Sequence, residues 1–161
     1  MEESLELGIG RILRERKLTL AFGESCTGGL IGHRITNVPG SSDYFIGGVA
    51  VYAYEAKVKL LGVNWETLKK YGAVSQETVL EMARGARSVL GADIGLSVCC
   101  IAGPGGATPS KPVGTSWVGL STPDGEWTRH FVFGHDRLGN KEALADAALV
   151  VLLEYLEGAL Q

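Results

Sequence analysis

Residues 23–30 read GESCTGGL and lie where an apolar segment, residues 18–22, gives way to a helix-like segment, residues 30–38. Ser25 occupies the nucleophile position of a G-x-S-x-G elbow, although Thr27 replaces the last glycine. The first turn of a helix also presents free N–H groups and the positive end of the helix dipole, which favour a phosphate or a developing oxyanion. A serine that only caps the helix is the third interpretation, and the spacing alone leaves all three open.

A serine nucleophile requires a base that takes its proton. We expect the three histidines to be surface residues rather than such a base: His33, His130 and His135. Lys57 is the alternative, because it follows a predicted strand that ends near Tyr52, and strand ends build the sites of α/β sheets. A lysine accepts a proton only when it is neutral, a state that burial favours. The competing interpretation is a solvated lysine on a helix.

The chain contains three cysteines, Cys26, Cys99 and Cys100. Cys26 is an alternative nucleophile, because a thiol at a helix N-terminus can have a lowered pKa. Cys99 and Cys100 end an apolar strand and are expected to be small core residues. Three cysteines, two of them adjacent, are not typical of a disulfide framework and indicate a reducing, intracellular compartment. No His, Cys or Asp spacing resembles a metal site.

Two further segments have chemical potential. Residues 103–114, GPGGATPSKPVG, form a loop rich in glycine and proline after a predicted buried strand. This loop is either a rigid connection or a backbone that wraps a ligand, and its position favours the ligand. Arg137 and Lys141 lie near the start of the last predicted helix, where they either hold a phosphate or remain solvated.

The elements that must position these residues alternate between helix and strand. Apolar periodicity and turn signals predict helices over residues 3–16, 27–37, 55–62, 64–71, 75–90 and 139–158. Strands are predicted over residues 18–23, 44–54 and 93–103, followed by a hairpin around residues 123–125. This order indicates an α/β fold, a three-layer α/β/α sandwich with a mixed central sheet, and one domain over residues 1–161.

Charge and hydropathy argue against nucleic acid and membranes as partners. The net charge is −3 and the lysines and arginines are scattered, which argues against a nucleic-acid partner bound through phosphates. No apolar run reaches the roughly 20 residues of a membrane span, and the N-terminal residues lack the apolar stretch of a signal peptide. We therefore expect a soluble, cytoplasmic protein with no membrane partner.

The motifs taken together resemble the C-terminal domain family of the competence-damage-inducible protein CinA, which includes stand-alone nicotinamide-nucleotide amidases. The resemblance runs from about residue 10 to residue 156. It is carried by motifs that occur in the same order here: ESCTGGL (24–30), VPGSSDYFIGGV (38–49), YAYEAK (52–57), LLGV (60–63), GAVSQET (72–78), IAGPGG (101–106) and TPSKPVGT (108–115).

The resemblance implies an amidohydrolase that converts nicotinamide mononucleotide to nicotinate mononucleotide and ammonia, with no metal or organic cofactor. It makes Ser25 the nucleophile, Lys57 the general base and Tyr52 a residue that assists proton transfer or orients Lys57. It also implies a nucleotide site lined by Cys26, Thr27, Gly28, Gly29, Ser41, Ser42, Cys99, Gly103, Gly105, Gly106 and Arg137. A compact α/β domain of this kind is compatible with a homodimer.

The chain departs from the family pattern at three places. Tyr54 stands where the family usually has asparagine, Cys99-Cys100 replace Thr-Gly, and Lys141 stands where a second arginine is common. The substitution at Cys99 and Cys100 motivates a second hypothesis, a non-catalytic protein that binds a pyridine nucleotide or a related metabolite. A third keeps the catalytic residues and changes the amide substrate.

Overall fold

The computed structural model describes residues 2–160 and contains one five-stranded mixed sheet in the order β2-β1-β3-β4-β5. The strands are β1 (Leu20–Glu24), β2 (Phe45–Ala50), β3 (Ile94–Cys100), β4 (Thr115–Thr122) and β5 (Gly125–Val132). β2, β1 and β3 run parallel, whereas β3, β4 and β5 are antiparallel. The predicted mixed sheet is therefore confirmed.

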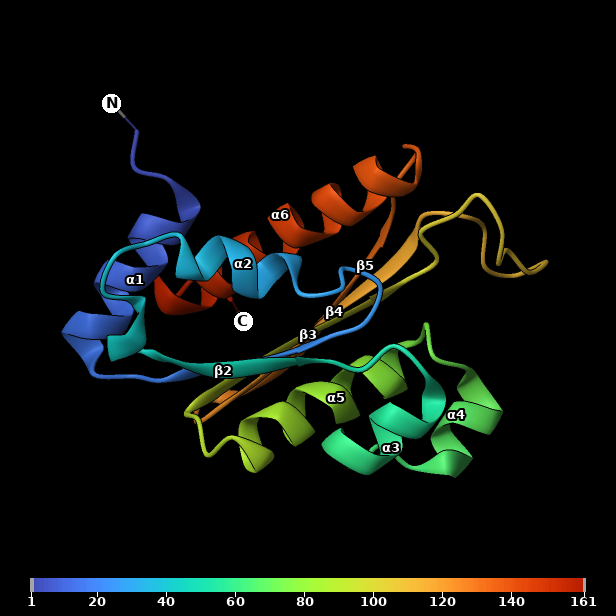
Figure 1. Ribbon diagram of the computed structural model, residues 1–161, viewed down its shortest axis with the longest axis horizontal. Helices are drawn as coiled ribbons and strands as arrows, with labels where there is room; N and C mark the ends of the chain where they lie inside the picture. Colours follow the sequence, from blue (N-terminus) through green and yellow to red (C-terminus); the bar gives the residue numbers. More distant parts are fainter. Residues whose placement is uncertain (1, 161) are drawn as a thin grey trace.

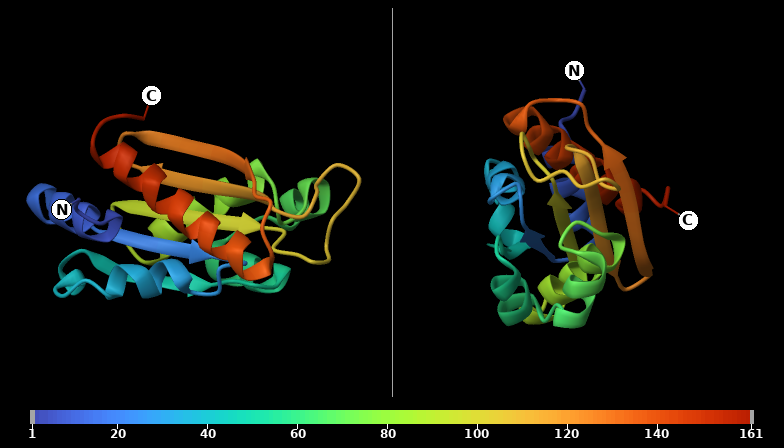
Figure 2. Two further views of the ribbon diagram at one scale, coloured as in Figure 1. Left: turned by 90° about the horizontal axis from the view of Figure 1, so that it is seen from above. Right: turned by 90° about the vertical axis from the view of Figure 1, so that its right-hand side faces the viewer.

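Helices cover both faces of the sheet (Figure 1). One face carries α1 (Leu5–Arg16), α2 (Leu30–Thr36) and α6 (Arg137–Leu156). The other carries α3 (Tyr54–Leu61), α4 (Trp65–Tyr71) and α5 (Gln76–Val89), and a short 3-10 turn, η1 (Ser41–Asp43), precedes β2. Figure 2 shows the three layers from two further directions and the long loop between β3 and β4 that extends beyond them. The predicted α/β/α sandwich is confirmed.

The alternation of side chains along β1 assigns its residues to two cores. Leu20 and Phe22 pack in the larger core beneath α1, α2 and α6, whereas Ala21 belongs to the smaller core beneath α3 and α5. All of β1 is buried, as expected for a central parallel strand covered on both faces. The same alternation continues past the strand, so Ser25 and Cys26 leave β1 on opposite faces of the sheet.

Glycines let α5 approach its neighbours closely. A Cβ atom at Gly85 would lie 1.9 Å from the carbonyl oxygen of Leu61 in α3, and one at Gly95 would lie 2.2 Å from that of Ala83. These contacts account for two of the 23 glycines of the chain, because any side chain there would push α5 away from α3 and the sheet.

Several predicted boundaries shift for local reasons. The strand predicted over residues 44–54 ends at Ala50, because the chain turns there to start α3 at Tyr54. The helix predicted from residue 27 starts at Leu30, because residues 26–29 form a turn. The last helix starts at Arg137, where the Asp136 side chain accepts a hydrogen bond from the Gly139 N–H.

Other predicted helix and hairpin signals are confirmed, with one exception. Ser75 caps α5 by accepting a hydrogen bond from the Thr78 N–H, and the hairpin turns between Thr122 and Gly125. Asn64 precedes α4 but makes no side-chain cap, and its side chain donates to Glu81 instead. Within residues 2–160, no helix is long and apolar enough to cross a membrane.

Candidate active site

Ser25 lies immediately after the carboxyl end of β1, in a turn closed by a hydrogen bond from the Gly28 N–H to the Ser25 carbonyl oxygen. The side chain faces the layer of α3 and α5 and is 9% exposed. Gly28 and Gly29 follow with φ angles of 63° and 106°, a conformation that favours glycine. The two glycines of the motif therefore let the chain turn from β1 into α2 directly after Ser25.

Lys57 lies in α3 and is fully buried, with 0% exposure. Its Nζ lies 3.0 Å from Ser25 Oγ, 2.7 Å from the Val51 carbonyl oxygen and 3.0 Å from the Tyr52 carbonyl oxygen. The segment between β2 and α3 supplies both carbonyl groups. The interpretation of Lys57 as a solvated helix lysine is therefore wrong, and the structure brings Ser25 and Lys57 together as the resemblance implied.

The environment of Lys57 favours the neutral amine. Burial lowers the pKa of Lys57, and within residues 2–160 no carboxylate forms an ion pair with it. A neutral amine has two N–H bonds and one lone pair. The carbonyl oxygens of Val51 and Tyr52 accept from Nζ, so a neutral Lys57 that keeps these two hydrogen bonds directs its lone pair toward Ser25 Oγ, 3.0 Å away. This geometry suits a general base.

Cys99 lies in the wall of the site rather than at its surface. It is 1% exposed and lies near Lys57. Burial raises the pKa of the Cys99 thiol to about 12, so the thiol is protonated at neutral pH. The expectation that Cys99 lines the substrate site is corrected, because β3 directs this side chain into the closed layer beneath α5.

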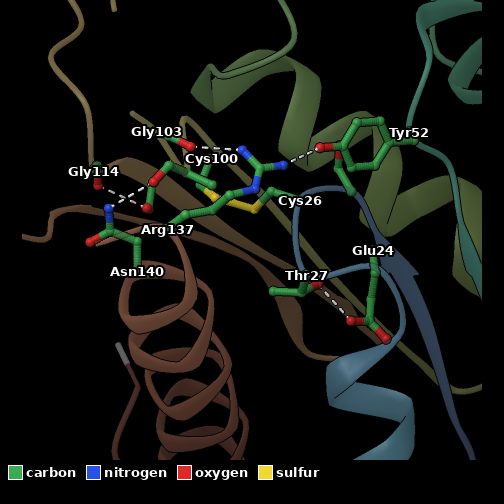
Figure 3. Close-up of a disulfide and its surroundings, with 12 residues drawn as sticks. Glu24, Cys26, Thr27, Tyr52, Cys100, Gly103, Gly114, Arg137 and Asn140 are labelled. Carbon is green, nitrogen blue, oxygen red and sulfur yellow. Dashed lines mark hydrogen bonds between the residues drawn. A yellow bond between two sulfur atoms is a disulfide. The ribbon is translucent and has the colours of Figure 1, made fainter. Parts of the chain in front are cut away.

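Cys26 and Cys100 form a disulfide, with their Cα atoms 5.8 Å apart (Figure 3). The expectation that the cysteines form no disulfide was wrong, and so was the alternative of Cys26 as a thiol nucleophile. The reason is tertiary: β1 and β3 are parallel neighbours with Gly23 opposite Ser97. Cys26, two residues past the end of β1, therefore lies beside Cys100, the last residue of β3, despite a separation of 74 residues. Both sulfurs lie on the face opposite Ser25 and Cys99.

The N-terminus of α2 is occupied by a side chain of the protein itself. The Glu24 carboxylate accepts hydrogen bonds from the N–H groups of Ile31 and Gly32, each at 3.0 Å, and from Thr27 Oγ1 at 2.6 Å. The predicted anion site is therefore corrected at this point, because Glu24 takes those donors. The N–H groups of Cys26 and Thr27 donate to no acceptor within residues 2–160 and remain available near Ser25.

Tyr52 contacts Lys57 through its main chain only. Its carbonyl oxygen accepts from Lys57, whereas its hydroxyl accepts a hydrogen bond of 2.9 Å from Arg137, and the residue is 61% exposed. Arg137 also donates to the Gly103 carbonyl oxygen at 2.8 Å. Figure 3 shows Arg137 extending across the disulfide toward both partners. The arginine thus ties α6 to the loop after β3 and to the segment that holds Lys57.

The loop after β3 is fixed at its base and exposed at its tip. Gly103 is buried and adopts a φ of 88°, whereas Gly105 and Gly106 belong to the exposed segment 104–110. Asn140, itself fully buried in α6, donates to the Ala102 carbonyl oxygen at 3.0 Å. The predicted loop therefore forms one rim of the region around Arg137.

Ser41 and Ser42 lie at the opposite end of the sheet. They belong to η1, which precedes the amino end of β2, whereas Ser25 follows the carboxyl end of the parallel strand β1 (Figure 1). Arg14 of α1 holds this segment through the Pro39 carbonyl oxygen and Asp43. The expectation that Ser41 and Ser42 line the site is corrected, because within this chain they lie at the other end of the sheet from Ser25.

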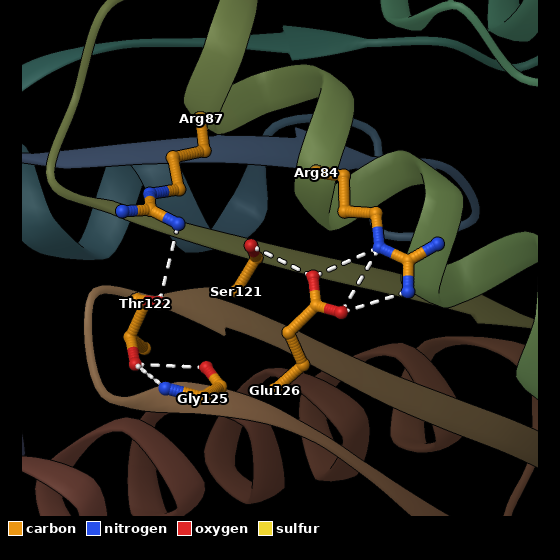
Figure 4. Close-up of polar contacts among 6 residues, drawn as sticks. All are labelled: Arg84, Arg87, Ser121, Thr122, Gly125 and Glu126. Carbon is orange, nitrogen blue, oxygen red and sulfur yellow. Dashed lines mark hydrogen bonds and ion pairs between the residues drawn. The ribbon is translucent and has the colours of Figure 1, made fainter.

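A polar cluster at that same end of the sheet is held by paired charges (Figure 4). Arg84 of α5 contacts Glu126 of β5 at 2.7 Å, and Ser121 donates to the same carboxylate. Hydrogen bonds from Arg84 lower the pKa of Glu126. Arg87 donates to the Thr122 carbonyl oxygen. These contacts fasten α5 to the β4–β5 hairpin and leave no buried, unpaired charge among these residues.

A hollow between the starts of α2 and α6 lies on the other side of the Ser25 turn. Its lining includes Gly28, Gly29 and His33 from the α2 side and Lys141 from α6. His33, His130 and His135 are all exposed, which confirms them as surface residues. Lys141 therefore borders a surface depression beside the glycine turn.

Two polar residues of the site, Glu24 and Asn140, are not predicted from the sequence. Glu24 directly precedes Ser25, and its position in the ESCTGG motif was the only signal. Asn140 is a buried amide one turn into α6, and a polar residue among apolar positions at helical spacing was the signal there. Within residues 2–160, no group of His, Cys, Asp and Glu side chains is arranged to hold a metal ion.

The structure is thus an α/β/α sandwich with a buried Ser–Lys pair near the carboxyl ends of its parallel strands. Residues 2–156 match the CinA C-terminal domain family, and the chain belongs to that family. It is 49% identical over 159 residues to a CinA-like protein of Chloroherpeton thalassium and 45% identical over 157 residues to one of Thermotoga maritima. These alignments cover 96% and 98% of the chain but 38% of each relative, so the chain spans well under half the length of these curated relatives.

Solved structures agree with the fold over nearly the whole chain. A competence damage-inducible protein A from Klebsiella pneumoniae superposes with a TM-score of 0.92 at 32% identity, covering 95% of both chains. A competence/damage inducible protein from Agrobacterium tumefaciens gives a TM-score of 0.89 at 34% identity, covering 98% of both chains. The fold expected from the resemblance is thus shared with solved members of the superfamily.

Proposed function

We propose that this domain is an amidohydrolase that converts nicotinamide mononucleotide to nicotinate mononucleotide and ammonia. The observation that carries the chemistry is the 3.0 Å contact between Ser25 Oγ and the Nζ of the fully buried Lys57. The identity of the substrate rests on the resemblance to the nicotinamide-nucleotide amidases of the CinA family. No metal or organic cofactor takes part in the proposed mechanism.

In the first half-reaction, Ser25 Oγ attacks the carboxamide carbon while Lys57 takes the hydroxyl proton. The resulting tetrahedral oxyanion accepts hydrogen bonds from the N–H groups of Cys26 and Thr27, which have no acceptor in the described part of the chain. Lys57 then gives its proton to the leaving nitrogen, the C–N bond breaks and ammonia departs. The product is an ester between nicotinate mononucleotide and Ser25.

In the second half-reaction, water replaces ammonia at the acyl group. Lys57 takes a proton from the water as it attacks the ester, and returns that proton to Ser25 Oγ when the ester bond breaks. The enzyme is restored and nicotinate mononucleotide is released. A general base of this kind contributes roughly 10²- to 10⁴-fold to the rate, so loss of Lys57 should have a large effect.

Positive groups near the glycine turn suit the phosphate of the nucleotide. Arg137 and Lys141 lie one turn apart at the start of α6, and Lys141 borders the hollow beside Gly28 and Gly29. Arginine and lysine are the usual partners of phosphate oxygens. We place the phosphate between these two side chains and the pyridine ring toward Ser25.

The proposal is tested by incubating the purified protein with nicotinamide mononucleotide and measuring ammonia together with nicotinate mononucleotide. Ser25→Ala serves as the loss-of-function variant and Ser88→Ala, at an exposed position of α5, as the matched control. We expect stoichiometric formation of both products that Ser25→Ala abolishes and Ser88→Ala preserves. Equal turnover by wild type and Ser25→Ala would contradict the proposed nucleophile.

The second candidate, a non-catalytic nucleotide-binding protein, is favoured by the substitution of Cys99 for the family's threonine. It predicts no ammonia release and a rise in melting temperature when nicotinamide mononucleotide is added. Turnover of another primary amide, again dependent on Ser25, would instead support an amidase with a different substrate.

A further inference from the structure

Glu24 is a buried carboxylate that forms no hydrogen bond or ion pair with Lys57 and is not used by the proposed chemistry. It is 3% exposed, and its two carboxylate oxygens accept three hydrogen bonds, one from a hydroxyl and two from main-chain N–H groups. All three donors, Thr27, Ile31 and Gly32, belong to the chain that follows Ser25. The side chain therefore determines how that chain leaves β1.

The main chain of Glu24 is fixed on the other side. Its carbonyl oxygen accepts a 2.8 Å hydrogen bond from the Val51 N–H, and the Val51 carbonyl oxygen accepts the 2.7 Å bond from Lys57 Nζ. Ser25 thus lies between two points that Glu24 holds: the segment that anchors the lysine, and the turn that leads into α2. A shift of either point would change the distance between Ser25 Oγ and Lys57 Nζ.

We infer that Glu24 is a positioning residue for the Ser25–Lys57 pair, an inference that rests on Ser25 being the proposed nucleophile. Its carboxylate holds the turn over residues 25–29 and the start of α2, so that Ser25 Oγ faces Lys57 and the N–H groups of Cys26 and Thr27 remain free for the reaction. A carboxylate is required because all three neighbours are donors and the acceptor must offer oxygen on both sides.

The structure contains a matched control for a purely structural role. At the amino end of β1, Asp93 accepts hydrogen bonds from the Thr19 N–H at 2.8 Å and from Thr19 Oγ1 at 3.0 Å. This pair has the same chemistry as Glu24 and Thr27 but lies at the opposite end of the strand from Ser25. Loss of either carboxylate removes similar hydrogen bonds, and only loss of Glu24 should disturb the reaction.

The experiment compares Glu24→Gln, Thr27→Val and Asp93→Asn with the wild type. Two rates are measured for each: steady-state hydrolysis of nicotinamide mononucleotide, and covalent labelling of Ser25 by a fluorophosphonate, which needs the nucleophile but not the nucleotide. In Glu24→Gln, the new NH₂ group faces at least one N–H donor and cannot accept from it, so at least one hydrogen bond is lost. We expect kcat and the labelling rate to fall roughly ten- to a hundredfold, because misplacing a reacting group by about 1 Å costs that much. KM and the pH midpoint should stay unchanged.

Thr27→Val should lower both rates less, because the carboxylate keeps two of its three hydrogen bonds, and Asp93→Asn should leave both rates as in the wild type. Wild-type rates in Glu24→Gln, or a melting temperature that falls while kcat does not, would overturn the inference. If Glu24→Gln does not fold, Thr27→Val carries the test, and wild-type rates in that variant would overturn the inference.

The two proposals fail in different ways. If the wild type labels at Ser25 but does not hydrolyse nicotinamide mononucleotide, the substrate assignment is wrong and the labelling rates still test Glu24. If Ser25 does not label in the wild type, Ser25 is not an activated nucleophile, and the inference about Glu24 is overturned with it.

Discussion

At both ends of β1 a carboxylate accepts hydrogen bonds from a threonine hydroxyl and from main-chain N–H groups, but only one end carries a candidate active site. At the amino end, Asp93 accepts from the N–H and hydroxyl of Thr19, and at the carboxyl end Glu24 accepts from the Thr27 hydroxyl and two main-chain N–H groups. A carboxylate paired with a threonine therefore fixes the chain both where it enters and where it leaves the strand. Such a pair does not by itself mark a functional site.

The two ends of the sheet differ in what surrounds their basic side chains. At the end of the sheet where β1 begins, Arg84 of α5 is exposed and paired with the Glu126 carboxylate of β5. At the carboxyl end, Lys57 is fully buried and meets only two carbonyl oxygens and the Ser25 hydroxyl. Burial without a carboxylate costs stability and shifts the lysine toward its neutral form, which a structural role does not require. That difference identifies the carboxyl end as the candidate active site.

Removal of the buried lysine should have the largest effect on turnover. Lys57→Met is expected to lower turnover about 10³-fold, within the range of general-base contributions. Lys59→Met, two residues further along the same helix at an exposed position, is the matched control and should keep wild-type turnover. Steady-state ammonia release measures both. Activity of Lys57→Met within a few-fold of the wild type would show that Lys57 is not the general base.

The Cys26–Cys100 disulfide should account for the next largest effect, on stability. It closes a loop of 74 residues by joining the carboxyl ends of β1 and β3, a link that the amino ends lack within residues 2–160. Cys100→Ala should lower the free energy of unfolding by about 2–4 kcal/mol. Thermal melts with and without dithiothreitol measure this effect.

Cys99→Ala provides the control for the disulfide, because Cys99 is a free, buried thiol on the opposite face of β3. This variant should keep the dependence of the melting temperature on dithiothreitol, and Cys100→Ala should lose it. A wild type whose melting temperature ignores the reductant, and which yields three reactive thiols on denaturation, would contradict the disulfide.

The pH dependence of activity should change about tenfold per pH unit below the pKa of the base. Lys57 is active when neutral, and burial lowers its pKa, so kcat/KM should rise with pH and level off at a midpoint below the ordinary lysine value of about 10.4. A pH–rate profile over the range where the fold is stable measures this. A profile that falls as the pH rises through neutrality would have the wrong sign for this base.

Tyr52→Phe should have the smallest of these effects, a loss of a few-fold in turnover. The hydroxyl that it removes contacts Arg137, whereas the carbonyl group that holds Lys57 stays in place. A single hydrogen bond of this kind is worth about 1 kcal/mol. A loss as large as that of Lys57→Met, with a changed pH midpoint, would instead support the proton-transfer role that the family resemblance implied for this tyrosine.

The local sequence predicted the elements well, because hydrophobic periodicity and turn residues act over short distances. The Ser75 cap and the turn after Thr122 are examples, and both depend on residues within a few positions of one another. The pairing of Ser25 with Lys57 was predicted from strand ends together with the family resemblance. Its burial, which decides the chemistry, followed only from the packing of α3 beneath the sheet.

The errors came from strand order and side-chain direction, which the local pattern does not contain. The sequence did not show that β1 and β3 are neighbours, so the pairing of Cys26 with Cys100 was missed. It does not show that Glu24 reaches the N–H groups of α2, which by sequence alone are equally open to a phosphate or an oxyanion. The expectation that Ser41 lies beside Ser25 came instead from the family resemblance, whereas η1 lies at the opposite end of the sheet.

Ser25 can be activated only if burial lowers the pKa of Lys57 enough to supply a neutral amine, and the titration of this lysine can be measured directly. Protein labelled with ¹³C at the lysine Cε is titrated by NMR, with Lys57→Met used to assign the resonance and Lys59 as the exposed reference in the same helix. We expect Lys57 to titrate below the ordinary lysine value of about 10.4. A Lys57 resonance that titrates with or above Lys59 would contradict this expectation, because the lysine would then hold its proton and could not activate Ser25.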